Sequence, residues 1–147
     1  MSHVVTELDV RRLGPGPQGR STWRLLAPLV YESDLVGTIS VPFGFVTDFA
    51  SVPRLPLAFM VAGDHAHQAA VIHDWLYTTH AVDGKPITRA QADAVFQEAI
   101  KCSDPDAPAA LMWLGVRVGG GGAWDAAGAE QPEHVAAAID YAKLEAP

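Results

Sequence analysis

Several features that define other protein classes are missing from this sequence of 147 residues. Cys102 is the only cysteine, so no disulfide can form within the chain and folding needs no oxidising compartment. No uncharged apolar run approaches the ~18–20 residues that cross a bilayer, and the first residues lack the apolar core of a signal peptide. The sequence therefore predicts a protein that is made in the cytoplasm, without a signal peptide or a transmembrane segment.

Basic residues are also scarce. Ten Lys and Arg against 17 Asp and Glu give a formal net charge of −7, whereas proteins that bind DNA or RNA cluster positive charge to neutralise phosphates. We therefore predict no nucleic-acid partner. The composition, 49% hydrophobic and 18% charged, is typical of globular rather than disordered chains, and the length suits a single domain over residues 1–147.

The first third of the chain has the pattern of strands. Partial alternation or β-branched and aromatic residues mark three runs, at 4–13, 23–31 and 36–46. In the last run the alternate positions are apolar, as a half-buried strand requires: Ile39, Val41, Phe43 and Phe45. Prolines then oppose regular structure and predict a loop over 47–56. We predict an antiparallel sheet within residues 1–56.

From residue 64 the apolar period changes to three and four, which indicates helices. One stripe runs from Ala66 to His80, with Asp64 as a possible N-cap, and a second follows a cap at Thr88. Further helices are predicted at 109–118 and 132–144, separated by a flexible joint at the glycines 119–122. Strands first and helices in residues 64–147 make an α+β fold, an antiparallel sheet followed by a small helical bundle.

The two middle helices are predicted to bring a histidine and a carboxylate together. If they pack antiparallel across residues 80–87, His73 lies seven residues before this connection and Asp93 six after it, at nearly the same level. A carboxylate that accepts a hydrogen bond from one imidazole nitrogen fixes the tautomer, and the other nitrogen can take a proton from water. We predict His73 as general base and Asp93 as its orienting group, with Tyr77 one turn away.

The neighbouring Asp74 points roughly 100° away around the helix, so it could ligate a metal beside the base. A structural interpretation stays open beside the catalytic one: the same side chains could form a buried polar network that only stabilises helix packing. Asp48, in the loop Thr-Asp-Phe-Ala-Ser, could equally be a ligand or the first residue of an Asx-turn.

Four ordered motifs carry a resemblance to a known family: G-F-V-T-D-F-A-S-V-P at 44–53, H-D-W-L-Y at 73–77, R-A-Q-A-D-A-V-F at 89–96 and W-L-G-V-R-V-G at 113–119. They resemble a phage and prophage family catalogued as domain of unknown function 1353, over roughly residues 36–124. The resemblance implies a virion-associated or tail-associated accessory protein. Its partners would be other virion or tail proteins and the host envelope, and it would be incorporated in a phage particle.

The order H-D-x-x-Y and then A-D-x-x-F also resembles phospholipases of the A2 class, above all the compact form in parvovirus capsid proteins. That resemblance implies His73 as the base, Asp93 as the group that orients it, and Asp74 as a calcium ligand. The chain departs from the family because it lacks disulfides and a glycine-rich calcium loop just upstream of Asp64. Backbone carbonyls of residues 44–48 would have to substitute, with Asp48 as an extra carboxylate.

Zinc is a weaker prediction than calcium, since the histidines lack the H-x-x-x-H and H-E-x-x-H spacings. The sequence thus leaves two functions open. One is a metal-assisted hydrolase that acts on lipid or cell-wall bonds of the host envelope, and the other is a non-enzymatic phage structural protein.

Overall fold

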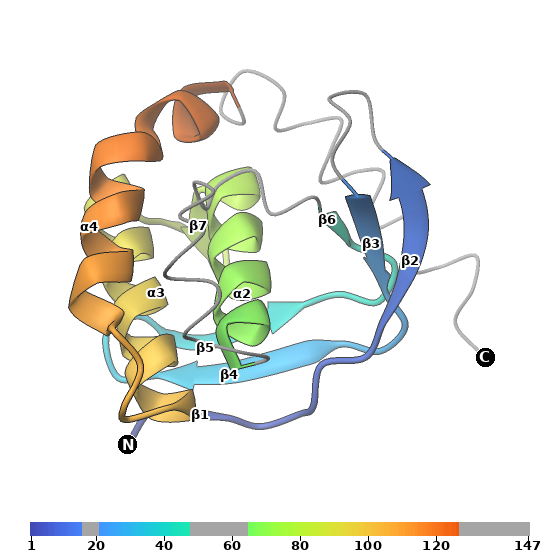
Figure 1. The fold of residues 1–147 in the computed structure, drawn as a ribbon, viewed down its shortest axis with the longest axis horizontal. Helices are drawn as coiled ribbons and strands as arrows, with labels where there is room; N and C mark the ends of the chain where they lie inside the picture. The colour runs from blue at the N-terminus through green and yellow to red at the C-terminus, as the bar shows by residue number, and fades with distance from the viewer. Residues whose placement is uncertain (16–20, 48–64, 127–147) are drawn as a thin grey trace.

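The computed structural model describes residues 1–15, 21–47 and 65–126, and it has the predicted α+β fold, with strands before helices (Figure 1). The strands before the first described helix are β1 (His3–Val4), β2 (Val10–Pro15), β3 (Ser21–Leu25), β4 (Leu29–Ser33), β5 (Gly37–Val41) and β6 (Val46–Thr47). The later elements are α2 (His65–Thr79), β7 (Ala81–Val82), β8 (Lys85–Pro86), α3 (Arg89–Ser103) and α4 (Ala109–Gly119). That residues 1–147 form a single domain stays a prediction.

The strands form two small antiparallel sheets and one hairpin. One sheet has the order β1-β4-β5 and the other β2-β3-β6, while β7 pairs with β8. The first sheet contacts the helices, with β4 against α3 and β5 against α2. Alternate residues of these two strands are buried, as their period of two requires: Leu29, Tyr31 and Ser33 in β4, and Ile39 and Val41 in β5.

The strands are shorter than the sequence predicted. The run 23–31 is divided between β3 and β4, and Pro28 lies in the break. The run 36–46 leaves the sheet after Val41, because Pro42 lacks a backbone donor and Gly44 has a φ of +87°, which closes a turn. Residues 48–56 of the predicted loop lie outside the described residues.

The helices α2, α3 and α4 run in alternating directions beside the first sheet, and α3 contacts both α2 and α4 (Figure 1). The predicted cap at Thr88 is confirmed as a full capping box, in which Thr88 and Gln91 exchange side-chain and backbone hydrogen bonds. The predicted inner faces are confirmed as well: Ala69, Ala70, Leu76, Ala92, Val95, Phe96 and Ile100 are all buried. The predicted cap Asp64 and the predicted helix 132–144 lie outside the described residues.

Two connections differ from the prediction. The link between α2 and α3 contains the β7–β8 hairpin, with Asp83 and Gly84 in its turn. The predicted helix over 109–118 is confirmed, since α4 ends at Gly119. The glycines do not form the predicted flexible joint, because helical structure resumes at residues 121–126, where the Trp124 amide donates to the Gly120 carbonyl at 3.1 Å. Across the part of the chain that the structure describes, no helix is both long enough and apolar enough to cross a membrane.

Candidate functional site

The structure brings His73 of α2 and Asp93 of α3 into contact. The imidazole Nε2 lies 2.7 Å from Asp93 Oδ1, and both side chains are 0% exposed. His73 and Asp93 meet because α2 and α3 run in opposite directions, which places the middle of α2 beside the first turns of α3 (Figure 1). The imidazole packs against the ring of Phe96, with ring centroids 4.8 Å apart. The geometry joins the two side chains, and their catalytic roles stay predictions.

Tyr77 completes the inner side of the site. Its hydroxyl donates to Asp93 Oδ1 at 2.6 Å, and its ring lies against the His73 imidazole at a centroid distance of 4.1 Å. A single carboxylate oxygen thus accepts two hydrogen bonds from residues one helical turn apart on α2. Burial raises the pKa of the Tyr77 hydroxyl, and its bond to Asp93 acts in the same direction. Tyr77 is therefore a neutral donor to Asp93.

Two arginines that the sequence interpretation missed bind the other side of the carboxylate. Arg117 of α4 donates from Nη1 to Asp93 Oδ2 at 2.8 Å, and Arg89 Nη1 lies 3.9 Å from the same oxygen. Arg89 also donates to the backbone carbonyls of Val116 at 3.3 Å and Arg117 at 3.1 Å, near the end of α4. Arg89 thereby fixes the segment of α4 that carries Arg117.

Sequence signals for both arginines existed. Arg89 precedes Asp93 by four residues on one predicted helix, a spacing at which opposite charges meet. Arg117 is the only charged residue between Ala109 and Gly119, which singles it out, but the local pattern does not give the direction in which its side chain points.

The pKa values in this cluster point to defined protonation states. Burial raises the pKa of Asp93, but the hydrogen bonds from His73, Tyr77 and Arg117 outweigh burial, so the net pKa is lowered and the carboxyl is ionised. Burial lowers the pKa of His73 despite the opposing effect of Asp93. The positive charge of Arg89 acts in the same direction as burial.

These states fix the tautomer of the histidine. An ionised carboxylate can only accept hydrogen bonds, so the proton between the two groups resides on His73 Nε2. A neutral imidazole with its proton on Nε2 has Nδ1 as its basic nitrogen. The arrangement therefore has the protonation pattern of an oriented general base.

Only one of the two predicted metal ligands, Asp74, lies within the described residues. Asp74 is half-buried and accepts a hydrogen bond from the Thr47 hydroxyl, which joins the end of β6 to α2. Asp48 lies outside the described residues. Within residues 1–15, 21–47 and 65–126, no group of three or more His, Cys, Asp or Glu side chains could hold a metal ion.

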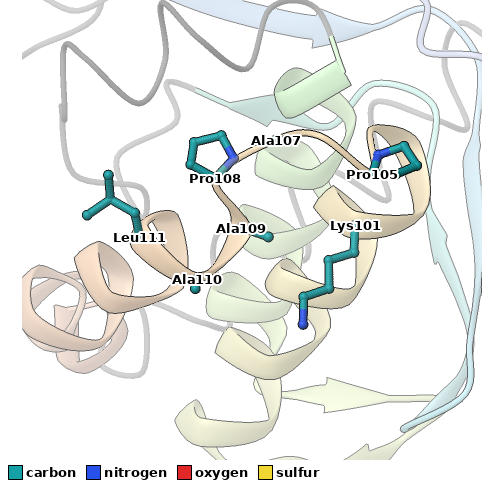
Figure 2. Close-up of a pocket in the computed structure, with 7 residues that line it drawn as sticks. All are labelled: Lys101, Pro105, Ala107, Pro108, Ala109, Ala110 and Leu111. Carbon is teal, nitrogen blue, oxygen red and sulfur yellow. The ribbon is translucent and has the colours of Figure 1, made fainter.

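An open surface cavity of about 640 Å³ lies at the bend between α3 and α4 (Figure 2). Its lining is mostly apolar: Lys101, Pro105, Ala107, Pro108, Ala109, Ala110 and Leu111. None of these residues belongs to the His73 cluster, so this cavity does not open onto the candidate base.

Comparison with known proteins gives one family. The family model described as protein of unknown function (DUF1353) matches residues 23–116, which is more than half of the chain and includes His73, Tyr77, Arg89 and Asp93. Arg117 lies one residue beyond the match. No curated protein and no solved structure matches the sequence.

Proposed function

The chain belongs to the DUF1353 family of proteins of unknown function, and we propose that it is a phage-encoded accessory protein in which His73 and Asp93 form the general-base dyad of a hydrolase. The observation that carries the proposal is the 2.7 Å hydrogen bond between His73 Nε2 and Asp93 Oδ1. The resemblance of the motifs to phage and prophage proteins supports a virion or tail setting, with other virion or tail proteins as partners.

Because the His73 side chain is 0% exposed, the proposed reaction requires an opening of the site that admits water and substrate. His73 Nδ1 then takes a proton from the water, and the resulting hydroxide attacks an ester or amide carbonyl of the host envelope. Asp93 keeps the imidazole in the required tautomer and stabilises the imidazolium that forms. The proton on Nδ1 then passes to the leaving group as the carbon–oxygen or carbon–nitrogen bond breaks. Arg117 and Tyr77 hold the carboxylate in place throughout.

We also propose a calcium ion bound through Asp74 and Asp48. No step of the reaction is assigned to this ion. A bound cation would polarise the substrate carbonyl. The described residues supply one of these two carboxylates, at Asp74, and it lies next to the proposed base in the chain.

A second candidate function has its own supporting observation. The His73 side chain is 0% exposed, as expected for a polar network that only fixes the packing of α2, α3 and α4. In that case the protein is a non-enzymatic virion or tail protein. The two candidates differ in whether loss of His73 removes a reaction or only lowers the free energy of unfolding.

The deciding experiment measures turnover of phospholipid vesicles and of peptidoglycan with calcium, with zinc and with a chelator. The proteins are the wild type, His73→Asn and the control His67→Asn, which changes an exposed histidine on the same helix. We expect the wild type and the control to be equally active and His73→Asn to be at least ~100-fold slower, the usual effect of losing a general base.

Denaturant unfolding of the same proteins completes the test, because rates are compared only for folded protein. Background rates for the wild type in every condition, together with a lower free energy of unfolding for His73→Asn, would establish the structural candidate. Activity that survives in folded His73→Asn would exclude the dyad but leave hydrolysis by other groups.

A further inference from the structure

Two arginines surround one oxygen of the buried Asp93 carboxylate. Arg117 Nη1 lies 2.8 Å from Asp93 Oδ2, and Arg89 Nη1 lies 3.9 Å from the same oxygen. Across the part of the chain that the structure describes, Asp93 is the only carboxylate within 4.0 Å of either guanidinium group. Two cations therefore face one anion, which leaves one positive charge that no carboxylate balances.

Both guanidinium groups keep donors that reach solvent. Arg117 is 31% exposed, and its hydrogen bond within the described residues goes to Asp93. Arg89 is 24% exposed and donates to the backbone carbonyls of Val116 and Arg117, which carry no formal charge. Neither arginine is among the described residues that bury a nitrogen without a partner, so their unpaired N–H groups lie at the surface.

The chain after α4 leaves the Arg89 guanidinium uncovered on one side. Gly121 lies beside it, and a Cβ at this residue would stand 3.8 Å from Arg89 Nη1 and 3.9 Å from Cζ. A Cβ at the next residue, Gly122, would meet nothing within 4 Å. Because residue 121 is glycine, no side chain occupies the space next to the guanidinium.

We propose that Arg89 and Arg117 together bind a phosphate group next to the pair of His73 and Asp93. The fork of an arginine matches two phosphate oxygens. Two guanidinium groups on different helices, α3 and α4, can bind a tetrahedral anion from two directions, which a planar carboxylate does not require. A phosphodiester carries one negative charge, equal to the positive charge that the cluster leaves unbalanced. The ligand is therefore the phosphate of a phospholipid headgroup or free phosphate.

This site deepens the proposed function, because it selects phospholipids among the substrates of the host envelope. That role rests on the proposed function, whereas the binding of phosphate does not. Burial dominates the pKa values of His73 and Tyr77, and the charge of Arg89 also acts on both. A phosphate held by Arg89 thus lies in the neighbourhood of the proposed base.

The test measures phosphate binding by phosphorus NMR on the full-length protein. One arm titrates inorganic phosphate, and the other titrates glycerophosphocholine, the soluble headgroup of a phospholipid. The net charge of −7 repels anions from the chain as a whole, so we expect a Kd of roughly 1–10 mM. Ionic strength is held constant, because salt screens surface charges. Binding of both compounds assigns the site to a lipid headgroup, and binding of inorganic phosphate alone assigns it to free phosphate.

Matched variants locate the site. Gly121→Asp places a carboxylate beside Arg89, where it competes with phosphate, so phosphate should bind at least ~10-fold more weakly. The control Gly122→Asp adds the same charge where a side chain meets nothing within 4 Å, and it should bind within roughly twofold of the wild type. Arg117→Lys keeps the charge that Asp93 faces but loses the fork, so it should bind several-fold more weakly.

Several results would contradict the proposal. A folded wild type that binds no phosphate up to ~100 mM, well above the expected Kd, excludes the site. Equal binding by the wild type, Gly121→Asp and Arg117→Lys, all folded by circular dichroism, places the phosphate elsewhere. Displacement of phosphate by an equal concentration of acetate excludes a preference for phosphate over a carboxylate. Binding is measured without turnover, so phosphate bound by an inactive wild type would reject the proposed hydrolase and support the site.

Discussion

Helix α3 carries two carboxylates that the fold treats in opposite ways. Asp93, near its start, is fully buried and binds a cation, an imidazole and a hydroxyl on α2 and α4. Glu98, five residues later, is half-buried and binds two neutral donors, the Tyr31 hydroxyl at 2.7 Å and the Asp34 amide at 3.2 Å, beside the first sheet. One helix thus joins its helical neighbours through charge and the sheet through neutral hydrogen bonds.

The difference indicates how strongly each carboxylate depends on its surroundings. Burying a carboxylate completely is costly unless a cation and further donors compensate it, and Asp93 receives all of them around a histidine whose tautomer it fixes. A carboxylate that joins a helix to a sheet through neutral donors needs no such surroundings. We therefore expect substitutions at Asp93 to have large effects and substitutions at Glu98 to have small ones.

The largest effect should come from Asp93→Asn. The amide removes the charge that Arg117 and His73 face and presents a donor where three donors converge. Removing one partner of a buried ion pair costs about 3–5 kcal/mol, and the partial exposure of Arg117, 31%, places the loss near the lower value. Urea unfolding of the wild type and the variant measures it. If Asp93→Asn lowers the free energy of unfolding no more than Glu98→Gln does, the two carboxylates do not differ as proposed.

Gly120→Ala tests how tightly the side chains around Asp93 are packed. A Cβ at residue 120 would lie 2.6 Å from the Tyr77 hydroxyl oxygen, which Asp93 holds in place. Displacing the buried Tyr77 ring should cost about 1–3 kcal/mol. Tyr77→Phe removes the clashing oxygen but also the hydrogen bond to Asp93, so the alanine should cost less in the Tyr77→Phe background than in the wild type, as thermal unfolding of all four proteins would report. An equal cost in both backgrounds would mean that the alanine acts elsewhere, for example on the Val116 carbonyl.

Acid should weaken the Asp93 cluster through His73. The pKa of His73 is lowered in the fold from 6.5, so below pH 6.5 the unfolded chain binds more protons than the folded one, and the free energy of unfolding falls as pH falls. The slope for one proton is at most about 1.4 kcal/mol per pH unit. His73→Asn should remove this part of the slope. Parallel curves for the wild type and the variant between pH 4 and 6.5 would contradict the lowered pKa.

Alkali should act in the opposite sense. The pKa values of Tyr31 and Tyr77 are raised from 10.0 by burial and by their carboxylate partners. Above pH 10 the unfolded chain loses these protons first, so the stability that the neutral hydroxyls provide declines as pH rises. Each tyrosine reports on one carboxylate, because Tyr77 binds Asp93 and Tyr31 binds Glu98.

The order of elements and the helix faces could be predicted because they depend on local periodicity. The stripe through His73 and Tyr77 and the cap at Thr88 follow from spacings within one helix. When a short connection joins two consecutive antiparallel helices, its length determines which residues of the two helices face each other. The contact between His73 and Asp93 could therefore be predicted too.

The remaining features depend on contacts between distant segments. Pro42 and Gly44 end a strand whose apolar alternation continues to Phe45, so periodicity alone overestimates its length. Gly120 looks like part of a flexible run, but its backbone lies against Tyr77, which a local pattern cannot reveal. The inward turn of Arg117 depends on the packing of α4 against α3.

The smallest effect should come from the second carboxylate. Glu98→Gln keeps a carbonyl oxygen that can accept from the Tyr31 hydroxyl, so we expect a loss of about 0.5–1.5 kcal/mol, the usual net value of one hydrogen bond. Tyr31→Phe should cost a similar amount and leave the Glu98 carboxylate near the Asp34 amide. In the double variant Glu98→Gln/Tyr31→Phe the two losses should not add, because both single changes weaken the same bond. Urea unfolding of all four proteins gives the coupling energy. A coupling above ~3 kcal/mol would place Glu98 in the same class as Asp93 and remove the distinction between the two ends of α3.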